Sequence, residues 1–144
     1  MINKNFSVTL YLGYLGLLPF FISYILVLFL PQRQAISEQA FTIYSIVIIA
    51  FMSGIHWGFA LTSNNEKSKK FVVSVIPPIL IWVFFLLIPT PFFIIFLGFM
   101  HIAGLKIDKI VFGHYEIEPN YHSMRLRLVV IVAMLHFLVA YATY

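Results

Sequence analysis

The amino-acid sequence predicts an all-α integral membrane protein, a single bundle of five transmembrane helices, and three observations support this fold class. First, 62% of the 144 residues are hydrophobic and only 10% are charged, which is more apolar surface than a soluble chain of this length can bury. Second, the apolar residues gather in five long runs. Third, no run shows the alternation of a membrane β-strand, whereas a helix satisfies its own backbone in lipid.

Each run has about the length of a spanning helix, roughly 20 residues at 1.5 Å each. The first run is too long for a signal peptide and is expected to remain in the protein. Pro89-Thr90-Pro91 is so short a link that the third and fourth helices must form an antiparallel hairpin. The expected helices cover about residues 6–30, 40–61, 71–88, 92–107 and 126–144.

Two features modify these helices. Pro19 and the pair Pro77-Pro78 remove backbone donors and are expected to kink the first and third helices. Residues 108–122 mix apolar with charged and polar side chains, which predicts an interfacial segment on the membrane surface.

The basic residues predict the orientation of the chain. Eight of the nine Lys and Arg residues lie in segments that share one side of a five-helix thread, and Arg33 alone lies on the other. The positive-inside rule therefore places the N-terminus in the cytoplasm and the C-terminus outside. Because the excess of basic residues encodes orientation, no nucleic-acid partner is expected.

A stripe of small residues marks the second helix. Ala50, Gly54 and Gly58 recur every four residues, the pattern that lets two helix backbones approach closely, within one chain or between two. A neighbouring helix is expected to pack against this stripe. His56 lies about 200° from Gly54 and Gly58 around the helix, so it faces away from the stripe. The helix is therefore expected to be central, with neighbours on both sides.

His56 and Trp57 allow two interpretations. An imidazole at membrane depth is costly unless it is hydrogen-bonded, and such groups are functional candidates. The alternative is that His56 and Trp57 lie close to the inner interface and serve as anchors and as bonds between helices.

Two further histidines, His101 and His136, lie in the fourth and fifth runs. His101 shares a helix face with Asp108, and His136 shares one with Arg125, so an ion pair between Asp108 and Arg125 is expected if the two helices are neighbours. The two histidines would then differ in depth by about 6 Å. Together with His56 they could ligate a haem or relay protons, and hydrogen-bonded structural roles are the alternative.

Enzymatic activity is not expected. The chain has no cysteine, which excludes thiolate metal sites and thiol catalysis. The predicted membrane runs hold no Asp or Glu, so paired acids are missing, and no histidine-rich metal signature is present. No metal site is therefore expected.

Several motifs resemble the uncharacterised transmembrane protein 69 family, a domain of unknown function, over nearly the whole chain. The most specific are Leu12-Gly-Tyr-Leu-Gly-Leu-Leu-Pro-Phe20 and Gly54-Ile-His-Trp-Gly58. Ser53 stands where the family pattern predicts a glycine, and His101 and His136 match no family position. The shared positions are Gly13, Gly16, Pro19, Gly54, His56, Trp57, Gly58, Pro77, Trp82, Asp108 and Arg125.

The resemblance implies a small multi-pass protein of the bacterial inner membrane, or of the mitochondrial inner membrane if the chain is eukaryotic. It supplies no activity, substrate or cofactor. The expected function is that of an accessory or assembly partner of a larger membrane complex, with a respiratory complex suggested by the mitochondrial members. The alternative is a haem- or quinone-binding membrane protein that uses His56, His101 and His136.

Overall fold

A computed structural model of the chain describes residues 4–113 and 120–144, with side chains from residue 8 onward. The described residues are almost entirely helical and contain no strand. Five helical stretches are long and apolar enough to cross a membrane. The elements are α1 (Lys4–Leu15), α2 (Leu18–Phe29), the short 3-10 helix η1 (Pro31–Arg33), α3 (Gln34–Thr62), α4 (Lys67–Leu87), α5 (Thr90–Phe112) and α6 (Tyr121–Thr143).

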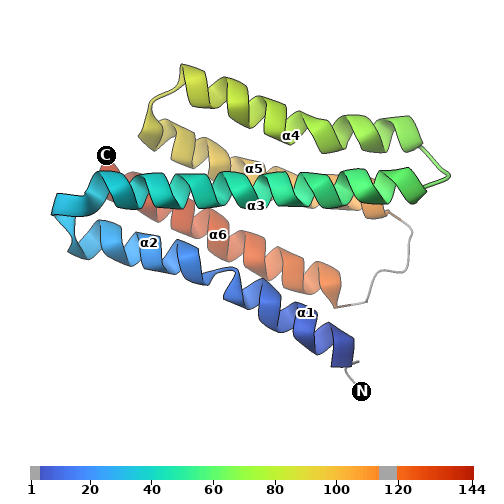
Figure 1. Cartoon of the computed structure of the whole chain (residues 1–144), viewed down its shortest axis with the longest axis horizontal. Helices are drawn as coiled ribbons and strands as arrows, with labels where there is room; N and C mark the ends of the chain where they lie inside the picture. The colour runs from blue at the N-terminus through green and yellow to red at the C-terminus, as the bar shows by residue number, and fades with distance from the viewer. Residues whose placement is uncertain (1–3, 114–119) are drawn as a thin grey trace.

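The long helix α3 is central, as predicted. It contacts α2, α4, α5 and α6, and in Figure 1 it runs across the middle of the bundle between α2 and α4, with α5 and α6 behind it. The two ends of the chain lie at opposite ends of the bundle (Figure 1). The five long helical stretches run alternately in opposite directions, and this odd number leaves the two ends of the chain far apart.

The first spanning stretch is interrupted rather than kinked. The helix breaks at Gly16 and Leu17, and Pro19 occupies the first turn of α2, where its missing amide hydrogen costs least. The phenol hydroxyl of Tyr44 donates to the carbonyl oxygen of Gly16 at 2.8 Å, which satisfies a carbonyl at the break. Pro77 and Pro78, by contrast, lie inside a helix that continues through both residues.

The predicted small-residue stripe faces outward. Ala50, Gly54 and Gly58 are all exposed, and a methyl group added at Gly54 or Gly58 would meet no atom within 4 Å. Of the two forms of this prediction, packing within one chain is therefore not found at Gly54 or Gly58 in the described part of the chain. The opposite face of α3 carries Ser53 and His56, whose polar atoms need partners that lipid cannot supply, so that face turns inward.

The helices are longer than the apolar runs. At the two ends of the predicted interfacial segment, residues 108–122, α5 continues to Phe112 and α6 starts at Tyr121; residues 114–119 of that segment lie outside the described part. Asp108 stays helical because it finds charged and polar partners inside the bundle, described below. The helix ends at Gly113, whose φ of 41° is a conformation that suits glycine.

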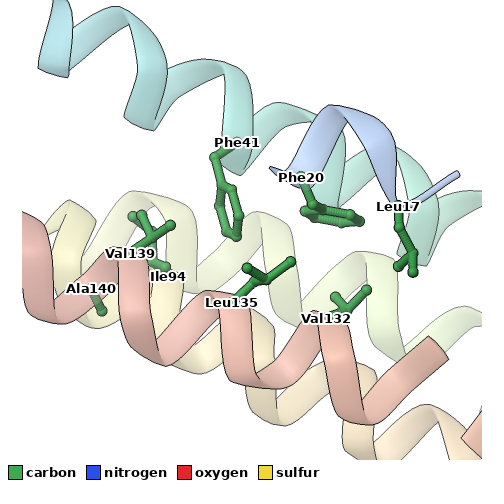
Figure 2. Close-up of a cluster of buried hydrophobic side chains, with 8 residues drawn as sticks. All are labelled: Leu17, Phe20, Phe41, Ile94, Val132, Leu135, Val139 and Ala140. Atoms are coloured by element: carbon green, nitrogen blue, oxygen red, sulfur yellow. The ribbon is translucent and has the colours of Figure 1, made fainter. Parts of the chain in front are cut away.

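A core of apolar side chains joins α2, α3, α5 and α6. Phe20 and Phe41 pack edge to face with ring centroids 5.2 Å apart, and the side chains from α6 face them in Figure 2. Such pairs hold helices together in lipid by van der Waals packing. The cluster comprises Leu17, Phe20, Phe41, Ile94, Val132, Leu135, Val139 and Ala140.

Candidate functional site

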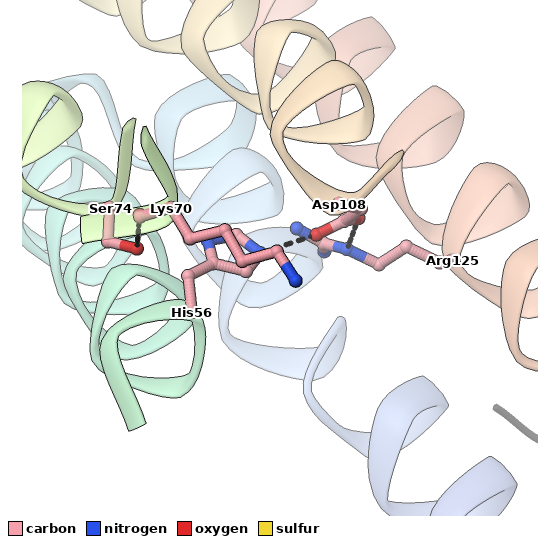
Figure 3. A network of polar contacts seen from close by, with 5 residues as sticks. All are labelled: His56, Lys70, Ser74, Asp108 and Arg125. Atoms are coloured by element: carbon pink, nitrogen blue, oxygen red, sulfur yellow. Dashed lines mark hydrogen bonds and ion pairs between the residues drawn. The ribbon is translucent and has the colours of Figure 1, made fainter. Parts of the chain in front are cut away.

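A charged cluster lies where α3, α5 and α6 meet. The Nε2 atom of His56 is 2.7 Å from Oδ1 of Asp108, and Nε of Arg125 donates to the other carboxylate oxygen at 3.0 Å. Figure 3 shows His56 and Arg125 approaching Asp108 from opposite sides. All three residues are buried. We call His56, Asp108 and Arg125 the carboxylate cluster.

The ion pair predicted between Asp108 and Arg125 is thereby confirmed. An unpaired carboxylate in the bundle would be very costly, and two partners on separate oxygens reduce that cost. The fourth predicted run ended at residue 107, just before Asp108, whereas α5 continues to Phe112 and carries Asp108 into the interior of the bundle. The third partner, His56, was not predicted to join this pair.

A second basic residue, Lys70, lies in the first turn of α4, next to the loop that joins α3 to α4. Lys70 of α4 is buried, and its Nζ atom donates to Oγ of Ser63 at 2.6 Å and lies 5.7 Å above the ring centroid of Phe59. The hydroxyl of Ser74 donates to the carbonyl oxygen of Lys70 at 2.6 Å (Figure 3). The contacts of Lys70 with Ser63 and Phe59 fix the start of α4 against the end of α3, whereas the bond from Ser74 lies within α4.

A second polar cluster lies farther from the loop between α3 and α4 than the carboxylate cluster does. The hydroxyl of Ser45 lies 3.0 Å from Nε2 of His101 and 2.8 Å from Nε2 of His136, and Nδ1 of His136 is 2.7 Å from the carbonyl oxygen of Val132. Phe20 and Phe41 pack against the imidazole of His136, with centroids 5.7 and 4.7 Å from it. We call Ser45, His101 and His136 the histidine cluster.

The hydrogen-bond pattern assigns the protons of the histidine cluster. A carbonyl oxygen only accepts, so Nδ1 of His136 carries a hydrogen, and in a neutral ring Nε2 is then an acceptor. Ser45 therefore donates its single hydrogen to His136 and accepts one from Nε2 of His101. The neutral ring of His101 is left with a bare Nδ1 atom. Neutral rings are the favourable state in this apolar setting.

A large cavity lies beside the histidine cluster. Its volume is about 480 Å³, within the range typical of ligand pockets. The walls are mostly apolar side chains of the first spanning stretch, α3 and α6, among them Leu12, Phe51 and Leu128. Its polar lining comes chiefly from His101, Tyr121 and Arg125.

A small cavity of about 20 Å³ lies between the two clusters. Its lining includes Ser53 and His56 of α3, His101 and Gly104 of α5, and Arg125 of α6. Met52, His101 and Arg125 line both cavities, so they separate the large cavity from the small one.

The three predicted histidines fall into two groups. His101 and His136, expected about 6 Å apart in depth, have ring centroids 5.1 Å apart, whereas His56 belongs to the carboxylate cluster. Nε2 of each histidine already has a partner within 3.0 Å, so the arrangement does not fit a haem between these rings. In the described part of the chain, no group of three or more His, Cys, Asp and Glu side chains is placed to hold a metal ion.

Trp57 lies at the surface of the bundle rather than in either cluster. It is partly exposed and packs against Phe71 of α4, with ring centroids 4.6 Å apart. This contact ties α3 to α4 on the side away from the large cavity.

Sequence reasoning missed Ser45, which joins the two histidines. A signal for it exists, because the buried face of α3 repeats polar side chains at helical spacing, and such a row on a membrane helix indicates an inward face. The buried polar residues of this face are Ser37, Thr42, Ser45, Ser53 and His56.

Comparisons with known proteins give one positive result. No curated protein and no solved structure matches the chain. A family model described as "Protein of unknown function (DUF3429)" matches residues 6–141. Because the match covers almost the full length, the chain belongs to the DUF3429 family.

Proposed function

We propose that this protein binds a membrane-soluble small molecule in the large cavity between the first spanning stretch, α3 and α6. The observation that carries the proposal is an apolar cavity of about 480 Å³ that has an arginine and a histidine in its lining. Pockets that combine apolar walls with a few converging polar groups are typical of ligand sites.

The polar lining favours a ligand whose head group accepts hydrogen bonds. Arg125 donates its Nε–H to Asp108, and the other nitrogens of its guanidinium group carry further N–H donors. Tyr121 adds a phenol hydroxyl to the same lining. A quinone ring, with two carbonyl acceptors and an apolar tail, has this chemistry. The quinone-binding alternative therefore stands with His101 and Arg125 as its residues, whereas His56 lies outside this cavity.

The test compares two tryptophan substitutions on one helix. Leu128→Trp places a large ring in the cavity lining, whereas Leu126→Trp adds the same ring at a position that is exposed on the bundle surface. Each variant is purified in mild detergent, and bound lipids and quinones are extracted and quantified by mass spectrometry. We expect a small molecule that remains with the wild type and Leu126→Trp, and that is lost from Leu128→Trp.

The proposal fails if the wild type retains no small molecule and binds no added quinone or neutral lipid. It also fails if Leu128→Trp retains as much as Leu126→Trp. Absorbance between 350 and 600 nm on the same samples tests the haem form of the alternative.

A second candidate function is that of an accessory or assembly partner of a larger membrane complex. The outward stripe of Ala50, Gly54 and Gly58 supports it, since close helix contact needs such small residues and the chain leaves them uncovered. The resemblance to the transmembrane protein 69 family suggests a respiratory complex, and this is analogy alone. Self-association through the stripe is the other form of this proposal.

Affinity purification at native expression tests this role. Gly54→Leu and Gly58→Leu should abolish a stoichiometric partner or a dimer, and Val130→Leu, at an exposed position of α6, should not. Equal recovery of partners from all variants would exclude the stripe as the interface.

The same proposal places the chain in the bacterial inner membrane with its N-terminus in the cytoplasm, or in the mitochondrial inner membrane if it is eukaryotic. The distribution of Lys and Arg supports this orientation. A reporter fused after Tyr144 should be active only on the external side.

A further inference from the structure

The exposed sides of α5 and α6 adjoin and carry apolar and basic side chains. In α5 the exposed residues Phe99, Lys106 and Lys109 follow one another at seven and three residues, which places them on one side of the helix. Phe99 contacts Phe137 of α6, with ring centroids 5.5 Å apart, and both rings are exposed. On α6, Val130 and Arg127 continue the exposed side from Phe137 toward the start of the helix. We call this surface the α5–α6 flank, formed by Phe99, Lys106, Lys109, Arg127, Val130 and Phe137.

The pairing of the two helices brings the basic residues of this flank to one end of the bundle. The bond between Asp108 and Arg125 fixes how the antiparallel helices lie along one another. Two residues back from Asp108 on α5 is Lys106, and two residues on from Arg125 on α6 is Arg127, so these two lie at the same height. Lys109 follows Lys106 by one turn. This is the end of the bundle that also holds the loop between α3 and α4 (Figure 1).

These three cations differ from their neighbours in having no partner. The other described basic side chains at this end lie against a carboxylate or an aromatic ring, and they are Lys67, Lys69, Lys70 and Arg125. Among the described residues, no ion pair involves Lys106, Lys109 or Arg127. The positive-inside rule accounts for basic residues on one side of a membrane, but not for unpaired ones gathered on one helix pair. Their charges are available to an anion from outside the protein.

The position of the cations on the helices matches the head groups of a bilayer. Lys106 lies six residues before the end of α5 at Phe112, about 9 Å along the helix axis. A cation on a lipid-facing surface is costly there, and its long side chain can reach the head groups to find an anion. Farther from this end, the flank is apolar, since Phe99, Val130 and Phe137 are 56%, 48% and 40% exposed. This side suits acyl chains.

We propose that the α5–α6 flank binds one anionic phospholipid. The phosphate lies among the three cations, and the acyl chains lie along the apolar part of the flank. Basic sites between membrane helices bind acidic lipid head groups by the same charge complementarity. A zwitterionic lipid brings an ammonium group of its own, which the three cations repel, so the site selects net negative charge.

The experiment compares two double variants that each remove two positive charges from this end of the bundle. Lys106→Gln with Arg127→Gln is the test variant, and Lys67→Gln with Lys69→Gln is the matched control, since all four side chains are exposed. Each protein is purified in mild detergent and titrated with phosphatidylglycerol or with phosphatidylcholine of the same acyl chains. Native mass spectrometry measures the fraction of protein that carries a lipid.

We expect the wild type and the control to bind one phosphatidylglycerol in preference to phosphatidylcholine. The test variant should bind phosphatidylglycerol about 30-fold more weakly, about fivefold for each basic residue removed. Equal weakening in the two double variants, or no preference of the wild type for phosphatidylglycerol, would overturn the proposal. So would displacement of the lipid by an equal concentration of inorganic phosphate.

This site is separate from the large cavity, because none of its residues lines that cavity. Leu128→Trp, which fills the cavity lining, should leave the binding of phosphatidylglycerol unchanged. A loss in Leu128→Trp equal to that in the test variant would place the lipid in the large cavity and overturn the assignment to the flank. The two proposals can therefore fail independently.

Discussion

The carboxylate cluster and the histidine cluster place polar groups in the same bundle by opposite means. The carboxylate cluster holds an ionised pair with a histidine on the second carboxylate oxygen, whereas the histidine cluster holds neutral rings joined by one serine hydroxyl inside an aromatic setting. The first depends on charge balance, and the second depends on shape and the direction of hydrogen bonds. The two should therefore respond differently to the loss of one member.

The largest effect is expected from breaking the charge balance. Arg125→Leu leaves the carboxylate of Asp108 buried without its cation, which should lower the free energy of unfolding by about 3–5 kcal/mol. Arg127→Leu removes the same charge from an exposed position two residues away and serves as the control. Unfolding in mixed micelles measures both. A similar loss in the two variants would mean that the ion pair contributes little.

A smaller effect is expected from crowding the histidine cluster. A methyl group at Gly98 would lie 3.0 Å from Cβ of His136, an atom that cannot swing aside. Gly98→Ala should therefore lower the free energy of unfolding by about 1–3 kcal/mol through overpacking. The same change at the exposed Gly54 has open space around it. If Gly98→Ala proves as stable as Gly54→Ala, the packing around His136 is looser than described.

The smallest effect is expected from removing the hydroxyl that joins the two histidines. Ser45→Ala deletes both of its hydrogen bonds but leaves no uncompensated charge, so the loss should be about 1–2 kcal/mol. The ¹⁵N shifts of His101 and His136 should change together, while those of His56 change less. A loss as large as that in Arg125→Leu would remove the distinction between the clusters.

Residue spacing predicted much of this arrangement. The apolar runs are long enough to indicate five crossings, and the 200° offset of His56 from Gly54 correctly predicts opposite faces of α3. The pairing of Asp108 with Arg125 also follows from helix periodicity. These inferences succeed because they depend only on one helix or on charges that require a partner.

The remaining features depend on how helices rotate against one another. Ser45 joins His101 to His136 only because α5 and α6 both turn these residues toward α3, and no spacing within one helix encodes that. The outward direction of the Gly54 stripe is of the same kind, since small residues suit either side of a helix. Asp108 was expected to lie outside the fourth helix because it is charged. Its partners, His56 and Arg125, lie on other helices, so the spacing of residues within α5 does not show them.

The mouth of the large cavity has a consequence for how a ligand would arrive. Leu12 and Phe51 line the cavity and are each 63% exposed on the flank of the bundle, where a membrane protein meets hydrocarbon. A ligand of the proposed kind would therefore enter sideways from the lipid. Occupancy would then follow the mole fraction of ligand in the bilayer, so diluting vesicles with buffer would leave it bound, whereas fusing them with ligand-free lipid would release it.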